Sequence, residues 1–346
     1  MPVRSVATPR DGVSTAAVAS PPPAPRRSRV TVTQRSSVIA SALSALLLLG
    51  VAAGAPAQDP DWRFNRHDRH VKVALIAGSI GAFGDHPYGS LLEAWCENIE
   101  VENLSQVGQG APALYSLFRE QVLENPRVPL GAPGYEVWLL FGGGLNSVGA
   151  PERTNRAIRR IFQVAYRRRV GVVALTLTPW GSEDDARWRG ARALHVLRST
   201  RNVVDYVLGR ATPRQALGSY ARAREGVDWP GAPWLENERP NIAIDLYDSP
   251  LRHRDAEPWS LDRAREQLER DPAWVRAMRG LSPEQREARL ERDARELSEA
   301  PRFFLDPEYR GFDHIHPNRA GHHVMASTMC PRLPPSWGCA CPEGSQ

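Results

Sequence analysis

The run VKVALIAGS at residues 71–79 decides the fold predicted for this chain. Apart from Lys72, the first seven of these residues are apolar, which is typical of a strand buried on both faces. Gly78 and Gly81 flank Ser79 and relieve crowding in a tight turn from a strand into a helix. We therefore predict that Ser79 ends a first strand and points its hydroxyl into a crevice at the strand's carboxyl end.

Four further apolar runs predict strands at residues 99–103, 135–141, 171–176 and 241–246. Amphipathic helical patterns lie between them. The clearest, at 155–168, has one apolar face and an arginine-rich back, and Pro151 opens its segment. Alternating strands and helices predict an α/β fold with three α/β/α layers around a parallel sheet of about five strands. Active sites in such sheets gather outside the carboxyl ends of the strands.

The first 57 residues have the composition of an export leader. A lead with proline and arginine precedes the apolar stretch 38–55, and Ala55-Pro56-Ala57 fits an A-x-A cleavage site. We expect cleavage there, leaving residues 58–346 in the periplasm or outside the cell. An uncleaved membrane anchor is the alternative, because about 18 apolar residues can just span a bilayer.

The charge of the chain argues against a nucleic-acid partner. Of the 44 basic and 39 acidic side chains, the first 57 residues hold six and one, which leaves 38 of each in the remainder. A neutral body lacks the basic footprint that nucleic-acid binding requires.

Two segments interrupt the α/β pattern, at residues 180–240 and 260–300. The first carries a loop with Trp229 and Trp234, which could stack on a sugar or cover an acyl chain, although packing within the loop is the common alternative. The second is mostly charged helix, and Ser282-Pro283-Glu284-Gln285 predicts a capping box. Neither segment looks independent, so residues 58–346 are predicted to form one domain with two insertions.

Four cysteines, Cys96, Cys330, Cys339 and Cys341, lie in the part expected to be exported. An even number in an oxidising compartment predicts two disulfides, for which three connectivities are possible. Cys339 and Cys341 are too close to bridge comfortably, so each is expected to pair elsewhere. Zinc is the alternative, but no C-x-x-C spacing is present.

Four loops at strand ends supply the parts of an acyl-transfer site. Ser79 offers a hydroxyl, while Gly108 and Asn146 can offer a backbone N–H and a side-chain amide to a developing oxyanion. Asp313 precedes His316 by three residues, so that the carboxylate can hold one imidazole nitrogen and leave the other as a base.

In this chain order the residues resemble the SGNH hydrolase superfamily, also called GDSL-type esterases and lipases. The resemblance covers about residues 71–329 and rests on four blocks: Gly78-Ser79, Gly108, Gly144-Leu145-Asn146, and Asp313-His314-Ile315-His316. Two positions depart from the family pattern, since Gly78 and Ser147 stand where the family usually has aspartate.

The resemblance implies a flavodoxin-like sheet with strand order 2-1-3-4-5. It makes Ser79 the nucleophile, His316 the general base and then acid, and Asp313 the group that orients His316. The N–H groups of Ser79 and Gly108 and the amide of Asn146 form the implied oxyanion hole. The implied reaction is hydrolysis of a carbohydrate or lipid ester, and it needs no metal or organic cofactor.

The implied topology also predicts disulfide partners. The helix after Ser79 and the final helix fall on the same face of the sheet, so Cys96 can reach one tail cysteine while Cys330 pairs with the other.

Three other interpretations were weighed. A non-catalytic envelope protein could keep this fold and bind a saccharide or lipid. The G-x-S-x-G elbow of α/β-hydrolases normally follows several strands, whereas Ser79 ends the first. His314, His316, His322 and His323 could bind a metal, but in a helix starting near Pro317 the last two are expected at the surface.

Overall fold

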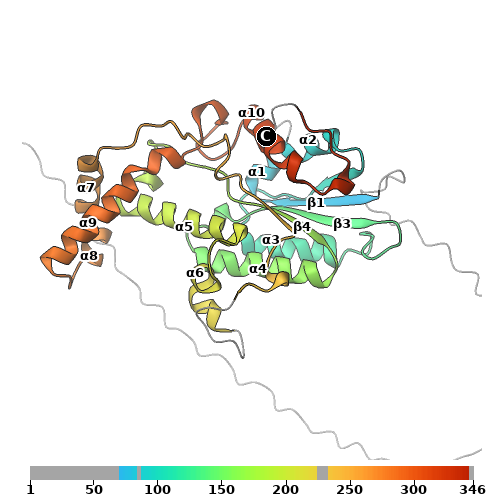
Figure 1. Ribbon diagram of the computed structural model, residues 1–346, viewed down its shortest axis with the longest axis horizontal. Coiled ribbons are helices and arrows are strands. Elements are labelled where there is room, and N and C mark those ends of the chain that lie inside the picture. Colours follow the sequence, from blue (N-terminus) through green and yellow to red (C-terminus); the bar gives the residue numbers. More distant parts are fainter. Residues whose placement is uncertain (1–69, 84–86, 224–232, 343–346) are drawn as a thin grey trace, which may run out of the picture. The chain divides into compact units, whose positions relative to one another are not determined.

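The computed structural model describes residues 70–83, 87–223 and 233–342 (Figure 1). Five parallel strands form one sheet in the order β2-β1-β3-β4-β5, which confirms the expected fold class and topology. The strands are β1 Val71–Ala77, β2 Ile99–Asn103, β3 Glu136–Gly142, β4 Gly171–Leu175 and β5 Ile242–Ile244. Each lies within two residues of its predicted position.

The sheet carries a separate hydrophobic core on each face because side chains alternate along every strand. In β1, Val73 and Leu75 join one core while Ala74 and Ile76 join the other. Helices α2 (Tyr88–Trp95) and α10 (Arg319–Met329) pack on the first face, and α3 (Ala111–Phe118), α4 (Pro151–Arg167) and α5 (Gly190–Leu208) on the second (Figure 1). Pro151 occupies the first turn of α4, as expected.

The two predicted insertions are helical where they are described. The first contains α5 and α6 (Pro213–Leu217), and the second contains α7 (Leu261–Glu269), α8 (Pro272–Ala277) and α9 (Pro283–Ser298). The predicted capping box at Ser282 and Gln285 is present and opens α9. Helices α7, α8 and α9 all contact α5, so the second insertion packs on the first.

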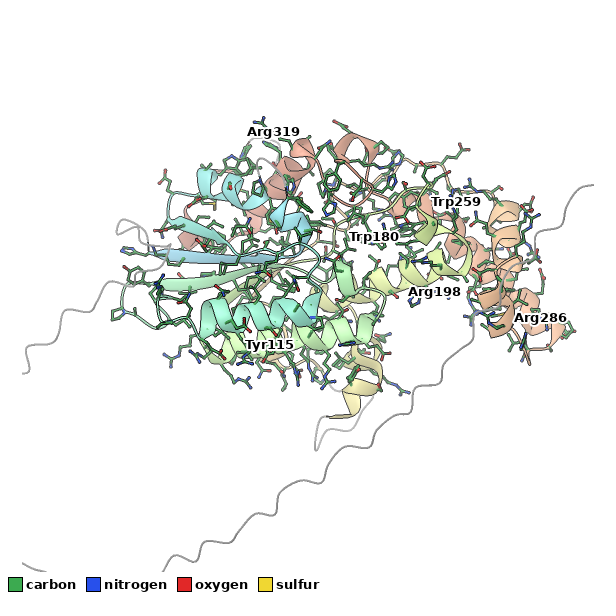
Figure 2. All side chains as sticks on the ribbon, turned by 180° about the vertical axis from the view of Figure 1, so that it is seen from behind. Tyr115, Trp180, Arg198, Trp259, Arg286 and Arg319 are labelled. Atoms are coloured by element: carbon green, nitrogen blue, oxygen red, sulfur yellow. A yellow bond between two sulfur atoms is a disulfide. The ribbon has the colours of Figure 1, made fainter. Side chains whose placement is uncertain are left out.

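A buried carboxylate joins these insertion helices to α5. Asp293 of α9 has no exposed surface and accepts hydrogen bonds from Arg198 Nη2 at 2.7 Å, Arg289 Nε at 2.8 Å and Trp274 Nε1 at 3.0 Å. Burial alone would raise the pKa of Asp293, but these three donors hold it below its usual value. Arg198 thus ties α5 to the second insertion (Figure 2).

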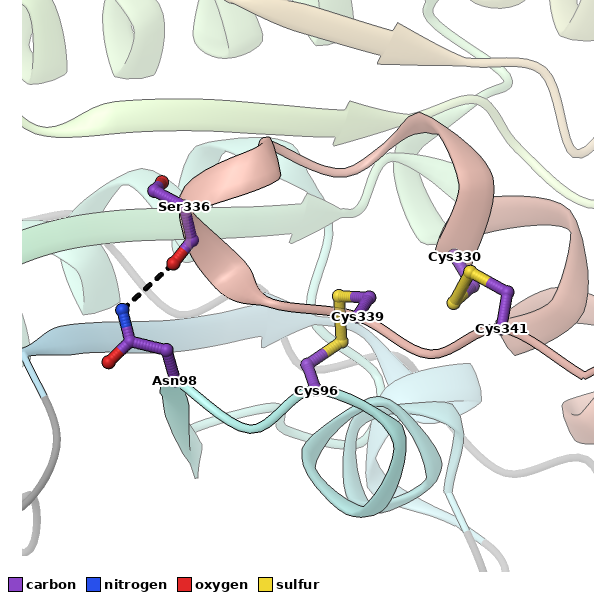
Figure 3. Close-up of a disulfide and its surroundings, with 6 residues drawn as sticks. All are labelled: Cys96, Asn98, Cys330, Ser336, Cys339 and Cys341. Atoms are coloured by element: carbon purple, nitrogen blue, oxygen red, sulfur yellow. Dashed lines mark hydrogen bonds between the residues drawn. A yellow bond between two sulfur atoms is a disulfide. The ribbon is translucent and has the colours of Figure 1, made fainter.

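Two disulfides staple the carboxyl-terminal segment to the sheet's first face (Figure 3). Cys96, at the end of α2, pairs with Cys339, and Cys330, at the end of α10, pairs with Cys341. The resemblance implied that Cys96 and Cys330 each pair with a tail cysteine, and this is one of the two pairings that it left open. Between them, Trp337 is fully buried, and the backbone oxygen of Ser336 accepts from Asn98 Nδ2 at 2.8 Å.

The lysine within β1 forms an ion pair with a glutamate of β2. Lys72, the single lysine of the chain, is fully buried, and its Nζ lies 2.8 Å from Glu100 Oε2 on the neighbouring strand β2. A buried charge is tolerated only with a close counter-charge. The pair lies within the sheet and leaves the carboxyl end of β1 for other chemistry.

Two sequence expectations fall outside the described residues: the leader at 1–57, and Trp229. Among the helices that are described, none has both the length and the apolar composition required to cross a bilayer.

Candidate active site

The turn that carries Ser79 is built by close contacts with the loop after β2. Ser79 is the first residue of α1 (Ser79–Ala82) and is 8% exposed. A Cβ at Gly81 would lie 2.5 Å from Ser105 Oγ, so only glycine fits there. Ser105 Oγ in turn accepts from the N–H of Ala77 at 3.1 Å, and Asn103 Nδ2 donates to the Gly81 oxygen at 2.8 Å. The loop after β2 therefore bonds the chain both before and after Ser79.

The proposed oxyanion donors converge beside this turn. A Cβ at Gly78 would lie 3.1 Å from Asn146 Nδ2 and 3.3 Å from the Gln109 oxygen. Asn146 Nδ2 also donates to that oxygen at 3.2 Å, which holds one amide hydrogen and fixes the orientation of the other. Gly108, directly before Gln109, has a φ of +75° that favours glycine. The loops after β1, β2 and β3 thus meet beside Ser79.

Ser147 has a structural role at the position where the family usually has aspartate. Its Oγ accepts from the N–H of Ala111 and donates to the Gly144 oxygen, both at 3.1 Å, and accepts from Thr154 Oγ1 at 2.9 Å. It ties the start of α3 to the loop that carries Asn146. The hydroxyl supplies an acceptor for a helix-terminal N–H, which is a task that a carboxylate can also perform.

Asp313 and His316 form the expected pair. His316 Nδ1 lies 3.0 Å from Asp313 Oδ1 and 2.9 Å from Oδ2, and Oδ1 also accepts from the backbone N–H groups of Ile315 and His316 at 2.8 Å each. Burial alone would raise the pKa of Asp313, but these donors hold it below its usual range. The carboxylate stays ionised and requires the proton of the imidazole on Nδ1, so Nε2 is left as the basic nitrogen.

Two phenylalanines enclose the imidazole. Phe312 stacks on His316 with ring centroids 4.9 Å apart, and Phe83 meets it edge-on at 5.1 Å. Phe83 directly follows α1, which Ser79 begins, so this contact places His316 at the end of the short helix that carries Ser79. Phe312 is 75% exposed, the largest exposed fraction among the large apolar side chains of the described residues.

Ser79, the predicted nucleophile, and His316, the predicted base, share no hydrogen bond among the described residues. Within residues 70–83, 87–223 and 233–342, His316 Nε2 is buried and has no hydrogen-bond partner. Bonds between a nucleophile and its base are often long in free enzymes and tighten when substrate binds. The arrangement therefore presents a buried, unpaired base nitrogen beside the Ser79 turn.

Backbone contacts fix the loop that presents His316. The oxygen of His316 accepts from the N–H of Gly311 at 2.7 Å, and the oxygen of His314 accepts from the N–H of Gly181 at 2.7 Å. Asn318 Oδ1 then caps α10 by accepting from the N–H of Gly321 at 2.9 Å. Hydrogen bonds therefore hold the loop on both sides of His316.

His322 corrects one expectation. It was expected at the surface, but it is 2% exposed and stacks on Tyr88 of α2 with ring centroids 6.0 Å apart. The first-face core covers α10 at this position. Burial, and then the charge of nearby His316, lower the pKa of His322 to about 4.

This buried histidine predicts acid sensitivity. Between pH 6.5 and about 4, His322 is protonated in the unfolded chain but not in the folded protein. The free energy of unfolding therefore falls as pH falls through this window. The shift corresponds to about 3 kcal/mol of unfolding free energy. Urea unfolding above and below the window should show the loss in the native protein.

His322→Gln should remove about that much of the pH dependence, whereas His323→Gln, an exposed neighbour on α10, should keep it. An unchanged pH dependence in His322→Gln would contradict the assignment.

Trp234 lies away from this constellation. Its Nε1 donates to the Ala211 oxygen at 2.8 Å, and its ring packs 5.0 Å from Tyr206 of α5. It is thus packed beside α5 and α6, which is the alternative weighed for this loop. A substrate-binding role for Trp229 and Trp234 stays a prediction.

The histidines around residue 316 do not gather for a metal. In the described part of the chain, no three His, Cys, Asp or Glu residues are placed to hold an ion. His323 instead packs edge-on against Trp95 with ring centroids 5.2 Å apart.

Several residues of the site were missed from sequence. Phe83, Phe312 and Gln109 contact His316 or Asn146 directly, and Asn103 and Ser105 support the nucleophile turn. Proximity in sequence to a motif residue was the one available signal, since each lies within five residues of Ser79, Gly108 or His316.

No protein-family model and no curated protein matches this sequence. Solved structures similar to the chain include a member of the lipolytic G-D-S-L family from Veillonella parvula, at 12% identity and a TM-score of 0.40, covering 75% of this chain and 96% of that one. A GDSL-like lipase from Bacteroides thetaiotaomicron has 12% identity and a TM-score of 0.37, covering 75% and 85%. A lipase/acylhydrolase from Enterococcus faecalis has 14% identity and a TM-score of 0.33, covering 75% and 92%.

Proposed function

We propose that this chain is an exported serine hydrolase that cleaves a carboxylic ester through an acyl-enzyme. The observation that carries the proposal is His316, whose Nδ1 is held by Asp313 and whose buried Nε2 is unpaired among the described residues, at the turn that begins with Ser79. A polarised imidazole beside a buried serine is the arrangement that activates a hydroxyl for acyl transfer.

Each residue has a defined step in the proposed reaction. His316 Nε2 takes the proton of Ser79 as Oγ attacks the ester carbonyl. The N–H groups of Ser79 and Gly108 and the second amide hydrogen of Asn146 receive the oxyanion. His316 then gives the proton to the leaving alcohol. Water, deprotonated by the same nitrogen, releases the acid and restores Ser79.

Export is part of the proposal. The A-x-A site at residues 55–57 and the two disulfides support it, because such bonds persist in oxidising compartments. The intact mass of the exported chain tests it: a mature chain that begins at Gln58 is expected, and a retained leader would contradict cleavage.

A fluorophosphonate probe tests the catalytic assignment without knowledge of the leaving group, since it reacts with activated serines. We expect labelling at Ser79 in the native protein, and loss of labelling in Ser79→Ala and His316→Ala. Ser90→Ala, an exposed serine on α2, is the matched control and should label normally. A folded native protein that does not label would oppose the hydrolase and favour a binding protein with the same fold.

A further inference from the structure

Helix α4 carries a row of arginines along its outer side. Arg153, Arg156, Arg160 and Arg167 follow one another at spacings of three, four and seven residues, with Gln163 filling the gap. These spacings place all of them on one helical face. Arg153, Arg160 and Arg167 are exposed, and nitrogen-tipped side chains project from this helix layer in Figure 2. The row runs for about 21 Å at 1.5 Å per residue.

This row is not neutralised. Helix α4 has five arginines and one acidic residue, Glu152, whereas α9 has four arginines and five acidic residues. No ion pair joins Arg153, Arg160 or Arg167 to any carboxylate in the described ranges. Arg159, which lies off the row, is the α4 arginine with an ion pair, 3.7 Å from Glu238. The arginine content of the chain therefore does not by itself explain the row, because in α9 the arginines alternate with carboxylates.

The row begins at the candidate active site. Arg153 lines an open cavity of 540 Å³ together with Gly108 and Asn146, the proposed oxyanion donors, and none of the residues lining it is acidic. At the other end, Arg167 lines a second open cavity, of 770 Å³, with two more arginines, Arg169 and Arg239, and one glutamate. The arginine row thus runs from a cavity lined by Gly108 and Asn146 to a basic cavity at the amino ends of β4 and β5.

We propose that the substrate is an O-acylated anionic polysaccharide that lies along α4 and presents its ester to Ser79; this rests on the proposed hydrolase function. Arg153, Arg156 and Arg160 follow one another at about one helical turn, 5–6 Å between Cβ atoms, which is close to the repeat of a pyranose chain, and Arg167 lies two turns further on. Arginine binds carboxylate and phosphate groups with paired N–H donors.

A polymer fits these observations better than a membrane surface. Membrane-surface helices expose their apolar face to lipid, whereas Ile158, Ile161 and Phe162 of α4 are buried in the protein core. Tyr166 is the one large exposed apolar side chain of α4 within the described residues. The row also ends at the cavity lined by Gly108 and Asn146, two of the proposed oxyanion donors.

The test compares esters on two polymers, O-acetylated polygalacturonate and O-acetylated xylan, the second being neutral. Arg160→Glu/Arg167→Glu should lower the ratio of kcat/KM on the anionic polymer to that on the neutral polymer by about tenfold or more, and should weaken the salt dependence of this ratio. The matched control is Arg286→Glu/Arg292→Glu on α9, which changes net charge equally. Figure 2 places Arg286 far from the helix layer marked by Tyr115. The control should keep the native ratio.

Binding separates this inference from the hydrolase assignment. Ser79→Ala protein should bind unmodified polygalacturonate in a salt-sensitive manner and lose that binding with the α4 double substitution. An equal ratio in native and α4-substituted proteins, or binding to anionic vesicles and not to the polymer, would overturn the proposal. If Ser79 is labelled but the native protein does not prefer the anionic polymer to the neutral one, the inference about the substrate is wrong and the hydrolase assignment stands. If the folded protein is not labelled, the hydrolase assignment is wrong.

Discussion

Replacing Asp313 by asparagine should lower kcat by about 10⁴-fold on any ester that the native protein hydrolyses. The asparagine oxygen can still accept from the backbone N–H groups of Ile315 and His316, which Asp313 Oδ1 does at 2.8 Å each, so the loop should keep its shape. The amide nitrogen, however, would face His316 Nδ1 as a donor. This favours the tautomer protonated on Nε2, which cannot take the proton of Ser79.

The readout is steady-state kinetics together with the thermal transition. Asp313→Asn should melt within a few degrees of the native protein, whereas Asp313→Ala, which also loses both backbone bonds, should lose stability as well as activity. Native-like kcat in a folded Asp313→Asn protein would show that His316 acts without a carboxylate, and would remove Asp313 from the catalytic assignment.

The strands of the sheet were predictable because each type of strand has a recognisable sequence pattern. A strand buried on both faces needs a near-continuous apolar run, and β1, β3 and β4 have one. The strand order and the disulfide partners could not be obtained from such runs, because pairing is decided by contacts between distant segments. The strand order came from the resemblance, which also joined Cys96 to the tail without choosing between Cys339 and Cys341. The Cys96–Cys339 bond, with a separation of 243 residues, shows how distant those segments are.

The polar members of the candidate site stand out in the sequence, and its apolar members do not. Ser79, Asp313 and His316 are chemically distinctive, and Ser79 directly follows a strand, where a parallel sheet gathers function. Phe83 and Phe312 carry no such mark, since an apolar residue in a loop is ordinarily a packing residue. Only the fold shows that they enclose His316.

The error at His322 has a physical origin. Its helix has a polar face and an apolar face, and a histidine can lie on either. The stacking partner, Tyr88, lies 234 positions earlier on α2, so no local pattern signals the burial. The insertions pose the same difficulty: the charge pattern of α9 predicts an exposed helix, yet Asp293 is buried because Arg198, Arg289 and Trp274 surround it.

Replacing Asn146 by alanine should lower kcat by about 10²–10³-fold with little effect on KM, because its amide is expected to bind the oxyanion more strongly in the transition state than in the ground state. The fold should tolerate the change. One amide hydrogen goes to the Gln109 oxygen at 3.2 Å, and the link from this loop to α3 is carried instead by Ser147.

Two variants isolate the oxyanion role from general damage to the loop. Asn146→Asp keeps the size of the side chain but places a carboxylate against the developing negative charge, so it should be at least as slow as Asn146→Ala. Ser147→Ala removes the hydroxyl that bonds Ala111 and should mainly lower stability. Measured kcat and urea unfolding on the three proteins distinguish these effects. If Ser147→Ala lost as much kcat at full folding as Asn146→Ala, the loss would reflect loop position, and Asn146 would not be the donor.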